Sequence, residues 1–257
     1  MKCHDILEKL DEMYPVSKAE DWDNSGFLVG DKDQEVKKIL VALDADDFVV
    51  EEAVRLGADM IVTHHPMIFT SVKSVTSETF TGRRIIKMIK NGIAYYACHT
   101  NYDILTMADL NAEMLGFTDT EPLEVTDAAI PEGIGKVGNI DKCSALEFAR
   151  KVKEVFELED LRVYGDLNKT VSRAAICSGS GKSMISLALK AGAEVYITGD
   201  IDHHSGIDAA ASGLIVMDAG HYGTEHCFMD EMAGKLKEMF PDAEVVKAGQ
   251  PRPYTLI

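Results

Sequence analysis

A pattern of strand, helix and strand occurs twice in this sequence, and the repetition restricts the possible folds more than any other feature. Short apolar runs rich in β-branched residues predict buried strands, and the segments between them carry apolar residues at helical spacing. The repeated pattern covers residues 39–43, 48–56 and 60–62 in the first copy, and residues 174–177, 184–191 and 194–197 in the second.

The two copies are related by a constant offset of 135 residues (188 − 53 = 135). A Gly-Ala-acid sequence is common where a helix turns into a strand, and this alternative alone accounts for four of the matching positions. The offset nevertheless holds outside that turn, which favours a tandem duplication of one αβ unit. The related positions are Val36 and Val171, Thr63 and Thr198, and the segments 53–59 and 188–194.

Alternating strands and helices predict an α/β fold with a largely parallel or mixed sheet. We assign residues 1–125 to the first αβ unit and residues 126–257 to the second. Residues 227–240 predict a long helix near the end of the chain, which is able to pack back on the first unit. Ligands bind at the carboxyl ends of the strands in such folds, so the polar residues after each strand are the candidate functional residues.

Charge and cysteine content exclude several classes of protein. The 43 acidic and 26 basic side chains give a net charge of −17, whereas binding to nucleic acid or to anionic membranes requires clustered Lys and Arg. The five scattered cysteines include no C-x-x-C pair, which favours reduced thiols and a cytoplasmic protein. The charged amphipathic helix expected at residues 2–14 does not resemble a signal peptide, and no apolar run is long enough to span a bilayer.

Histidines and a carboxylate follow two strands of the first copy. His64 and His65 follow residues 60–62 after a single threonine, Thr63, and His99 and Asp103 follow the strand expected at residues 93–97. Adjacent histidines point in different directions, so each is able to serve a different metal ion, or one is structural. The alternative for Asp103 is a turn or helix-cap hydrogen bond before the next helix.

A further imidazole and carboxylate follow the strand expected at residues 214–217. His221 and Glu225 are four residues apart in the first turn of a predicted helix, so they lie on one face of it. That arrangement suits a divalent cation. The alternative is an incidental histidine beside a glutamate that the helix dipole stabilises.

Together these residues form a set of nitrogen and oxygen ligands after three strands. Such a set suits zinc, iron, manganese, cobalt or nickel and does not select among them. Five protein ligands are too many for one catalytic zinc, whereas two ions bridged by a carboxylate use all five. The predicted ligands are His64, His65, Asp103, His221 and Glu225, with Glu225 as the bridge.

Five motifs spread over almost the whole chain resemble the Nif-three-like family, whose bacterial members are often called GTP cyclohydrolase type 2 homologues. The resemblance implies a duplicated α/β fold, a dinuclear metal site between the two halves and a ring-shaped homohexamer. It also implies the same five metal ligands. The motifs lie at residues 22–30, 63–66, 99–103, 198–200 and 220–225.

These observations predict a metal-dependent hydrolase in which two divalent ions lower the pKa of a bound water. The family name implies GTP as substrate, and an anionic small molecule or nucleotide remains compatible with the global charge because the field at the metals is local. The alternatives are a phosphoesterase, or a metal-binding scaffold or regulatory hexamer without turnover. His99 and His204 are candidates for proton transfer.

Two further features have structural interpretations. The turn at Gly179–Gly181 resembles a phosphate-binding loop, but the Walker pattern requires glycine where the chain has Ile176. A tight turn is the favoured interpretation, and a phosphate contact through backbone N–H groups is the alternative. The single tryptophan, Trp22, is interpreted as a packing residue rather than a stacking surface for substrate.

Overall fold

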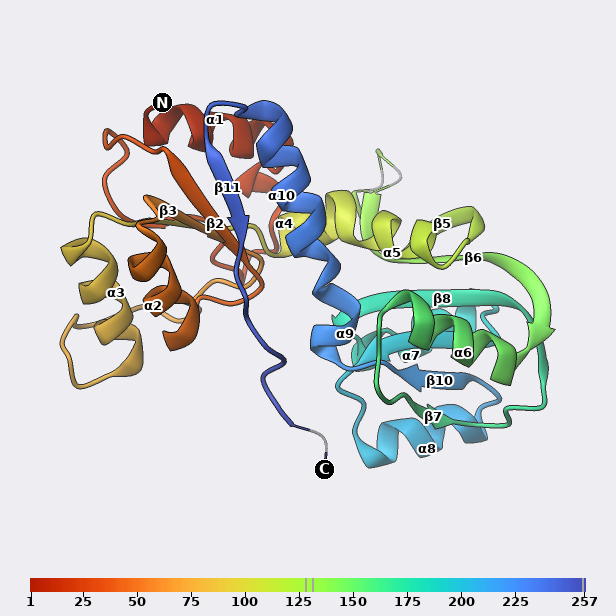
Figure 1. Cartoon of the computed structure of the whole chain (residues 1–257). Helices are drawn as coiled ribbons and strands as arrows, with labels where there is room; N and C mark the ends of the chain where they lie inside the picture. Colours follow the sequence, from red (N-terminus) through yellow and green to blue (C-terminus); the bar gives the residue numbers. More distant parts are fainter. Residues whose placement is uncertain (128, 131, 256) are drawn as a thin grey trace. The chain divides into compact units, whose positions relative to one another are not determined.

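The computed structural model describes residues 1–127, 129–130, 132–255 and 257. The chain forms two compact units, namely unit 1 (Met1–Tyr102 with Cys227–Ile257) and unit 2 (Asp103–His226), and both can be followed in Figure 1. This division differs from the sequence-based boundary after residue 125. The chain leaves unit 1 earlier than expected, at Tyr102, and its C-terminal segment returns to unit 1.

Unit 1 contains a five-stranded sheet in the order β1-β4-β3-β2-β11. Neighbouring strands are parallel, except that β1 runs antiparallel to β4. The central strands are buried on both faces, as expected for a parallel sheet that helices cover. The strands are β1 (Gly26–Val29), β2 (Lys38–Ala42), β3 (Met60–Thr63), β4 (Ala94–Ala97) and β11 (Glu244–Lys247).

Helices lie on both faces of this sheet. Apolar side chains of α2 and α3, including Val49 and Met88, pack with Leu40, Ile61 and Tyr95 of the sheet. The helices α1 and α10 lie side by side, as Figure 1 shows, and are joined by a 2.7 Å hydrogen bond between Lys235 and Tyr14. The helices are α1 (Cys3–Met13), η1 (Val16–Lys18), α2 (Asp47–Leu56), α3 (Phe80–Lys90), α4 (Thr100–Tyr102) and α10 (Cys227–Met239).

Unit 2 contains a six-stranded sheet in the order β5-β6-β8-β9-β10-β7. The strands are β5 (Thr118–Asp127), β6 (Glu132–Ser144), β7 (Arg162–Tyr164), β8 (Thr170–Ser180), β9 (Val195–Gly199) and β10 (Ile215–Asp218). The helical segments are η2 (Asp103–Met107), α5 (Ala108–Met114), α6 (Ala145–Val155), η3 (Lys182–Met184), α7 (Ile185–Lys190), α8 (His203–Ala211) and α9 (His221–Glu225).

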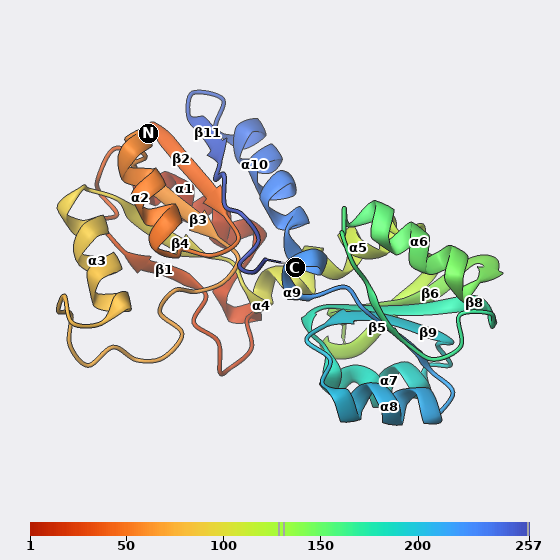
Figure 2. The same ribbon diagram turned by 60° about the horizontal axis from the view of Figure 1, so that its bottom comes forward.

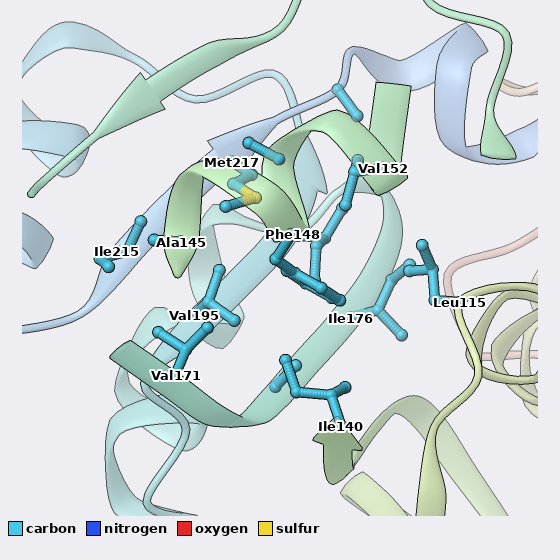
Figure 3. Close-up of a cluster of buried hydrophobic side chains, with 14 of the residues drawn as sticks. Leu115, Ile140, Ala145, Phe148, Val152, Val171, Ile176, Val195, Ile215 and Met217 are labelled. Atoms are coloured by element: carbon cyan, nitrogen blue, oxygen red, sulfur yellow. The ribbon is translucent and has the colours of Figure 1, made fainter. Parts of the chain in front are cut away.

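Alternate residues of the same strands in unit 2 point into two separate cores. On one face Ile176 and Ile197 pack with Phe148 and Val152 of α6, and Figure 3 shows part of this cluster. On the other face Tyr196 and neighbouring residues pack against α7 and α8. Figure 2 shows α6 on one side of the sheet and α7 with α8 on the other, so unit 2 is a three-layered α/β structure.

The strand registers support the predicted duplication. Ile39 pairs with Met60 between β2 and β3, and Ala174 pairs with Val195 between β8 and β9. Each member of the second pair lies 135 residues after its counterpart (174 − 39 and 195 − 60). The strand after each pair is also parallel, and each is followed outward by an antiparallel strand, β1 in unit 1 and β7 in unit 2.

Polar contacts repeat at the same offset. In each copy an acidic side chain just before the second strand accepts hydrogen bonds from two consecutive backbone N–H groups of the neighbouring strand. The basic residue on that strand donates to the end of the helix, from Lys38 to Leu56 O at 3.0 Å and from Arg173 to Ala191 O at 2.9 Å. The acidic contacts are Asp59 with Lys37 and Lys38, at 2.8 and 2.9 Å, and Glu194 with Ser172 and Arg173, at 2.7 and 3.3 Å.

The structure also bears on the state of the cysteines and on membrane-spanning helices. All five cysteines are free thiols. In the part of the chain that the structure describes, no helix is both long enough and apolar enough to cross a bilayer.

Candidate metal centre

His64 and His65 follow the end of β3, and each is oriented by an oxygen atom behind its ring. His64 Nδ1 lies 2.8 Å from the carbonyl oxygen of Cys98, and His65 Nδ1 lies 2.9 Å from Asp44 Oδ1. Both oxygens accept hydrogen bonds, so Nδ1 carries a hydrogen in each ring, and in the neutral imidazole Nε2 carries the lone pair. His64 is fully buried. Both imidazoles are therefore in the tautomer that binds a metal through Nε2.

His99 lies with these two histidines in unit 1. One ring nitrogen from each of His64, His65 and His99 falls within 4.8 Å of the others, which makes the three a candidate metal-binding group. His99 Nδ1 lies 2.8 Å from Asp23 Oδ1, so its tautomer is fixed in the same way. The sequence predicts only proton transfer for His99, and the structure brings it together with two predicted ligands.

Asp23 is held in place by several donors. Its other carboxylate oxygen accepts hydrogen bonds from the Ser25 hydroxyl at 2.8 Å and from the Thr100 hydroxyl at 2.7 Å. Burial alone raises the pKa of Asp23, but the hydrogen bonds from His99, Thr100 and Ser25 outweigh it and keep the pKa below its usual range. Asp23 is thus a carboxylate at neutral pH and an acceptor for His99.

In unit 2, His221 and Glu225 lie at the two ends of α9, on one face as their spacing predicts. His221 Nε2 and Glu225 Oε2 are 3.1 Å apart, and Glu225 is only 3% exposed. His221 Nδ1 lies 2.8 Å from Asp200 Oδ2, at the end of β9. Asp200 has a left-handed backbone with φ of 57°, which aspartate tolerates better than most residues. His221 Nε2 and the Glu225 carboxylate are therefore as close as two ligands of one cation would be, which suits a shared cation.

Asp103 begins the π-helical segment η2, and such segments are frequent at functional sites. With Cys177 and Ser178 it lines a small cavity of about 30 Å³ in unit 2. Burial raises the pKa of the Cys177 thiol to about 12, and the charges of Asp103 and Glu225 add to the effect. Cys177 is therefore a neutral thiol in the metal-free protein, and Asp103 and Glu225 are the candidate metal-binding groups near it.

Gly179 leaves room for Glu225. A Cβ atom at Gly179 would lie 2.3 Å from Glu225 Oε1 and 3.2 Å from His221 Nε2, so no larger residue fits without displacing them. The Gly179 N–H donates to Thr224 Oγ1 at 2.9 Å, and the Gly181 N–H donates to Thr198 Oγ1 at 3.0 Å. Both amides are bonded within the protein, which supports the tight-turn interpretation of this segment over a phosphate contact.

The other histidine proposed for proton transfer lies elsewhere. His204 is exposed at the start of α8, its backbone N–H donates to Asp202 Oδ1 at 3.1 Å, and its ring contacts His203. The structure does not bring it together with any predicted ligand in unit 2, where His221 pairs instead with Asp200. The sequence analysis missed Asp23, Asp44 and Asp200, the carboxylates behind the imidazoles. Asp23 and Asp200 lie inside the motifs at residues 22–30 and 198–200, and Asp44 and Asp200 follow the strands β2 and β9, but neither feature shows which ring nitrogen a carboxylate faces.

The fold and these clusters define an α/β protein whose His, Asp and Glu groups are suited to binding metal. Residues 1–253 match the family described as Duf34/NIF3 (NGG1p interacting factor 3). The chain belongs to this family, which confirms the resemblance of the five sequence motifs.

Relatives and solved structures agree with this assignment. The chain is 36% identical over 241 residues to a "GTP cyclohydrolase 1 type 2 homolog" of Clostridium perfringens, covering 93% of this chain and 92% of that protein. A Bacillus cereus protein related to NIF3 matches with a TM-score of 0.90 and 25% identity, over 100% of this chain and 99% of that one. Reduced HcgD from Methanocaldococcus jannaschii matches with a TM-score of 0.86 and 30% identity, over 97% and 98% of the two chains.

Proposed function

We propose that this protein is a metal-dependent hydrolase whose five predicted ligands hold two divalent cations, with Glu225 as the bridge. The observation that carries the proposal is the orientation of the imidazoles. In each of the three histidines His64, His65 and His221, Nδ1 lies within hydrogen-bond distance of a protein oxygen. Nε2 is then the ring atom able to bind a metal. Metal-binding histidines almost always have such a partner behind the ring, because it fixes the tautomer and raises the basicity of the ligand.

The chemistry of the donor set fits zinc, iron, manganese, cobalt or nickel, since these ions accept imidazole and carboxylate together. Burial raises the pKa of the nearby Cys177 thiol, so without a metal this side chain is a neutral thiol.

Divalent cations held by the five predicted ligands would supply a water of lowered pKa and a positive field for an electrophilic carbon or phosphorus. The side chains of the site have three further roles, which are orientation of the ligands, charge neutralisation and proton transfer. His64, His65 and His221 hold their rings in one orientation throughout, and Asp103 and Glu225 neutralise the bound charge. His99, hydrogen-bonded to Asp23, is placed to accept or release a proton at Nε2.

The names of the relatives support a GTP cyclohydrolase reaction as one form of this activity. A phosphoesterase needs the same ligands, and a scaffold or regulatory hexamer needs the metals without turnover. We also propose a homohexamer in the cytoplasm. The resemblance to the family supports the hexamer, and the free thiols support a reducing compartment.

The proposal is tested by metal analysis of the purified protein followed by turnover assays. We expect about two divalent ions per chain for the wild type, and release of product from GTP or from one of a panel of phosphoesters. Glu225→Gln keeps the shape of the side chain but weakens the bridge, so it should lose metal and at least about tenfold in activity. Glu238→Gln, which removes an exposed charge from α10, is the matched control.

Three outcomes would count against parts of this proposal. Less than one metal per chain, with Glu225→Gln equal to wild type, would refute the dinuclear centre. Two metals without turnover of any substrate would favour the scaffold. Light scattering that shows a stable monomer would refute the hexamer.

A further inference from the structure

Two large aromatic side chains of unit 1 stand exposed beside His99. Trp22 is 58% exposed and Phe69 is 53% exposed, although Trp22 is expected from the sequence to be a packing residue. The ring centroids of Trp22 and Phe69 are 5.9 Å apart, and those of Trp22 and His99 are also 5.9 Å apart. Phe69 and His99 are 6.3 Å apart, so the three rings form one cluster. We call Trp22 and Phe69 the aromatic pair.

Hydrogen bonds connect the two chain segments that carry the aromatic pair. The side-chain amide of Asn24 donates to the carbonyl oxygen of Ile68 at 2.5 Å, which ties the segment after Trp22 to the residue before Phe69. Asp23, which follows Trp22 in the chain, is hydrogen-bonded to His99 and Ser25. Both aromatic rings are thus presented to solvent at fixed positions, an arrangement that lowers the entropic cost of binding a ligand.

We propose that the aromatic pair is a stacking surface that holds a planar heteroaromatic ring of the substrate next to His99. This inference rests on the proposed function, because the substrate's ring would then lie beside the histidines of the proposed reaction. Aromatic side chains stack on the faces of flat ring systems, and every nucleobase offers such a face. Trp22 and Phe69 then determine specificity, selecting substrates with a ring over aliphatic phosphates.

Trp22 is the only tryptophan in the chain, so its fluorescence reports directly on this surface. The test titrates the wild-type protein with guanosine monophosphate and with ribose 5-phosphate, which keeps the sugar and phosphate but lacks the base. We expect saturable quenching by guanosine monophosphate and none by ribose 5-phosphate. Phe69→Leu keeps an apolar side chain without the aromatic face, so the dissociation constant should rise by roughly tenfold.

Phe80→Leu is the matched control, because Phe80 is 56% exposed on α3 and its ring contacts Arg84. We expect its dissociation constant to equal that of the wild type. Equal affinity in Phe69→Leu and wild type would overturn the proposal. Quenching that is linear in ligand, as for free tryptophan, would also overturn it. So would a Trp22 signal that responds to protein concentration instead of nucleotide, since a second copy of the chain would then cover the surface.

The same titration separates this inference from the proposed function, because it needs no turnover. Saturable quenching that persists in Glu225→Gln supports the stacking surface even if wild-type protein proves to lack metal or activity. Absence of quenching in a wild-type protein that binds two metals and turns over a substrate without a ring refutes the stacking surface and leaves the hydrolase intact.

Discussion

At the scale of single residues, the predicted ligand Glu225 depends on the backbone packed against its carboxylate, at Gly179. Gly179 has a φ of 62°, and the space that a Cβ would take is filled by the Glu225 carboxylate. A substitution there has two separable costs, the strain of a left-handed backbone and the collision with the carboxylate. Gly192 allows the two costs to be distinguished, because its φ is 74° and a Cβ there would meet nothing within 4 Å.

We therefore predict that Gly179→Ala weakens metal binding by at least about tenfold, because the ligand must move by more than its coordination geometry tolerates. Gly192→Ala carries comparable backbone strain and should bind metal as the wild type does. Calorimetric titration with zinc or manganese measures both. Equal metal affinity in the two variants would show that the contact with Glu225 is unimportant.

The residue types of the site could be predicted from the sequence, but their supporting partners could not. His64, His65 and His221 follow strands in a recognisable pattern. Asp44 and Asp200 are ordinary acidic residues in a chain with many of them, and their role depends on which ring nitrogen they face. That relation is set by side-chain geometry across the sheet, which spacing along the chain does not record.

At the scale of elements, the acidic residue before the second strand of each repeat holds the start of the strand beside it through hydrogen bonds. Burial raises the pKa of Glu194, but hydrogen bonds from Ser172 and from the Arg173 N–H outweigh it and lower the pKa overall. A carboxylate with a depressed pKa stabilises the fold fully above its unfolded-state pKa. That contribution is lost as the pH falls through the folded-state pKa.

Glu194→Gln should therefore lower the free energy of unfolding by about 1 kcal/mol at neutral pH, since the amide keeps only one acceptor and no charge. The difference from wild type should shrink at about pH 3, below the ordinary pKa of glutamate. Urea denaturation at both pH values measures this. Glu159→Gln, on an exposed residue, is the control and should show little effect at either pH. A difference that stays constant with pH would contradict the carboxylate's role.

Elements with clear apolar periodicity were predictable, and elements without it were not. The strands β2, β3, β9 and β10 appear as apolar runs because both of their faces are buried. In β5, by contrast, Leu123 is the only buried residue that the structure describes, so the strand has no alternating pattern to recognise. Its position depends on pairing with β6, a tertiary contact.

At the scale of the whole molecule, unit 1 is built from two separate parts of the sequence. Its C-terminal part supplies β11, which pairs with β2, and α10, whose Phe228, Met232 and Leu236 are buried. Unit 2 is one continuous segment with its own cores. The sequence suggested that the last helix packs on the first unit but did not indicate that a strand also returns.

Removal of residues 227–257 should therefore unfold unit 1 and spare unit 2. The truncation exposes the edge of β2 and the apolar face beneath α10. The stabilisation lost should exceed the free energy of unfolding of a typical domain, which is about 5–15 kcal/mol. Limited proteolysis followed by mass spectrometry should recover a protected fragment close to 103–226. A chain ending after Gln250 keeps β11 and is the control. Protection of residues 1–102 in the shorter chain would refute the prediction.

The return of β11 to β2 also sets an order of events during synthesis. The ribosome completes residues 103–226 before it makes the strand and helix that finish unit 1. Unit 2 is therefore able to fold on the nascent chain before unit 1, which is incomplete until residues 227–257 have been synthesised. During that interval the histidines after β3 belong to an unfinished sheet. If His64 and His65 bind metal as proposed, the metal would be loaded only after synthesis of the chain is complete.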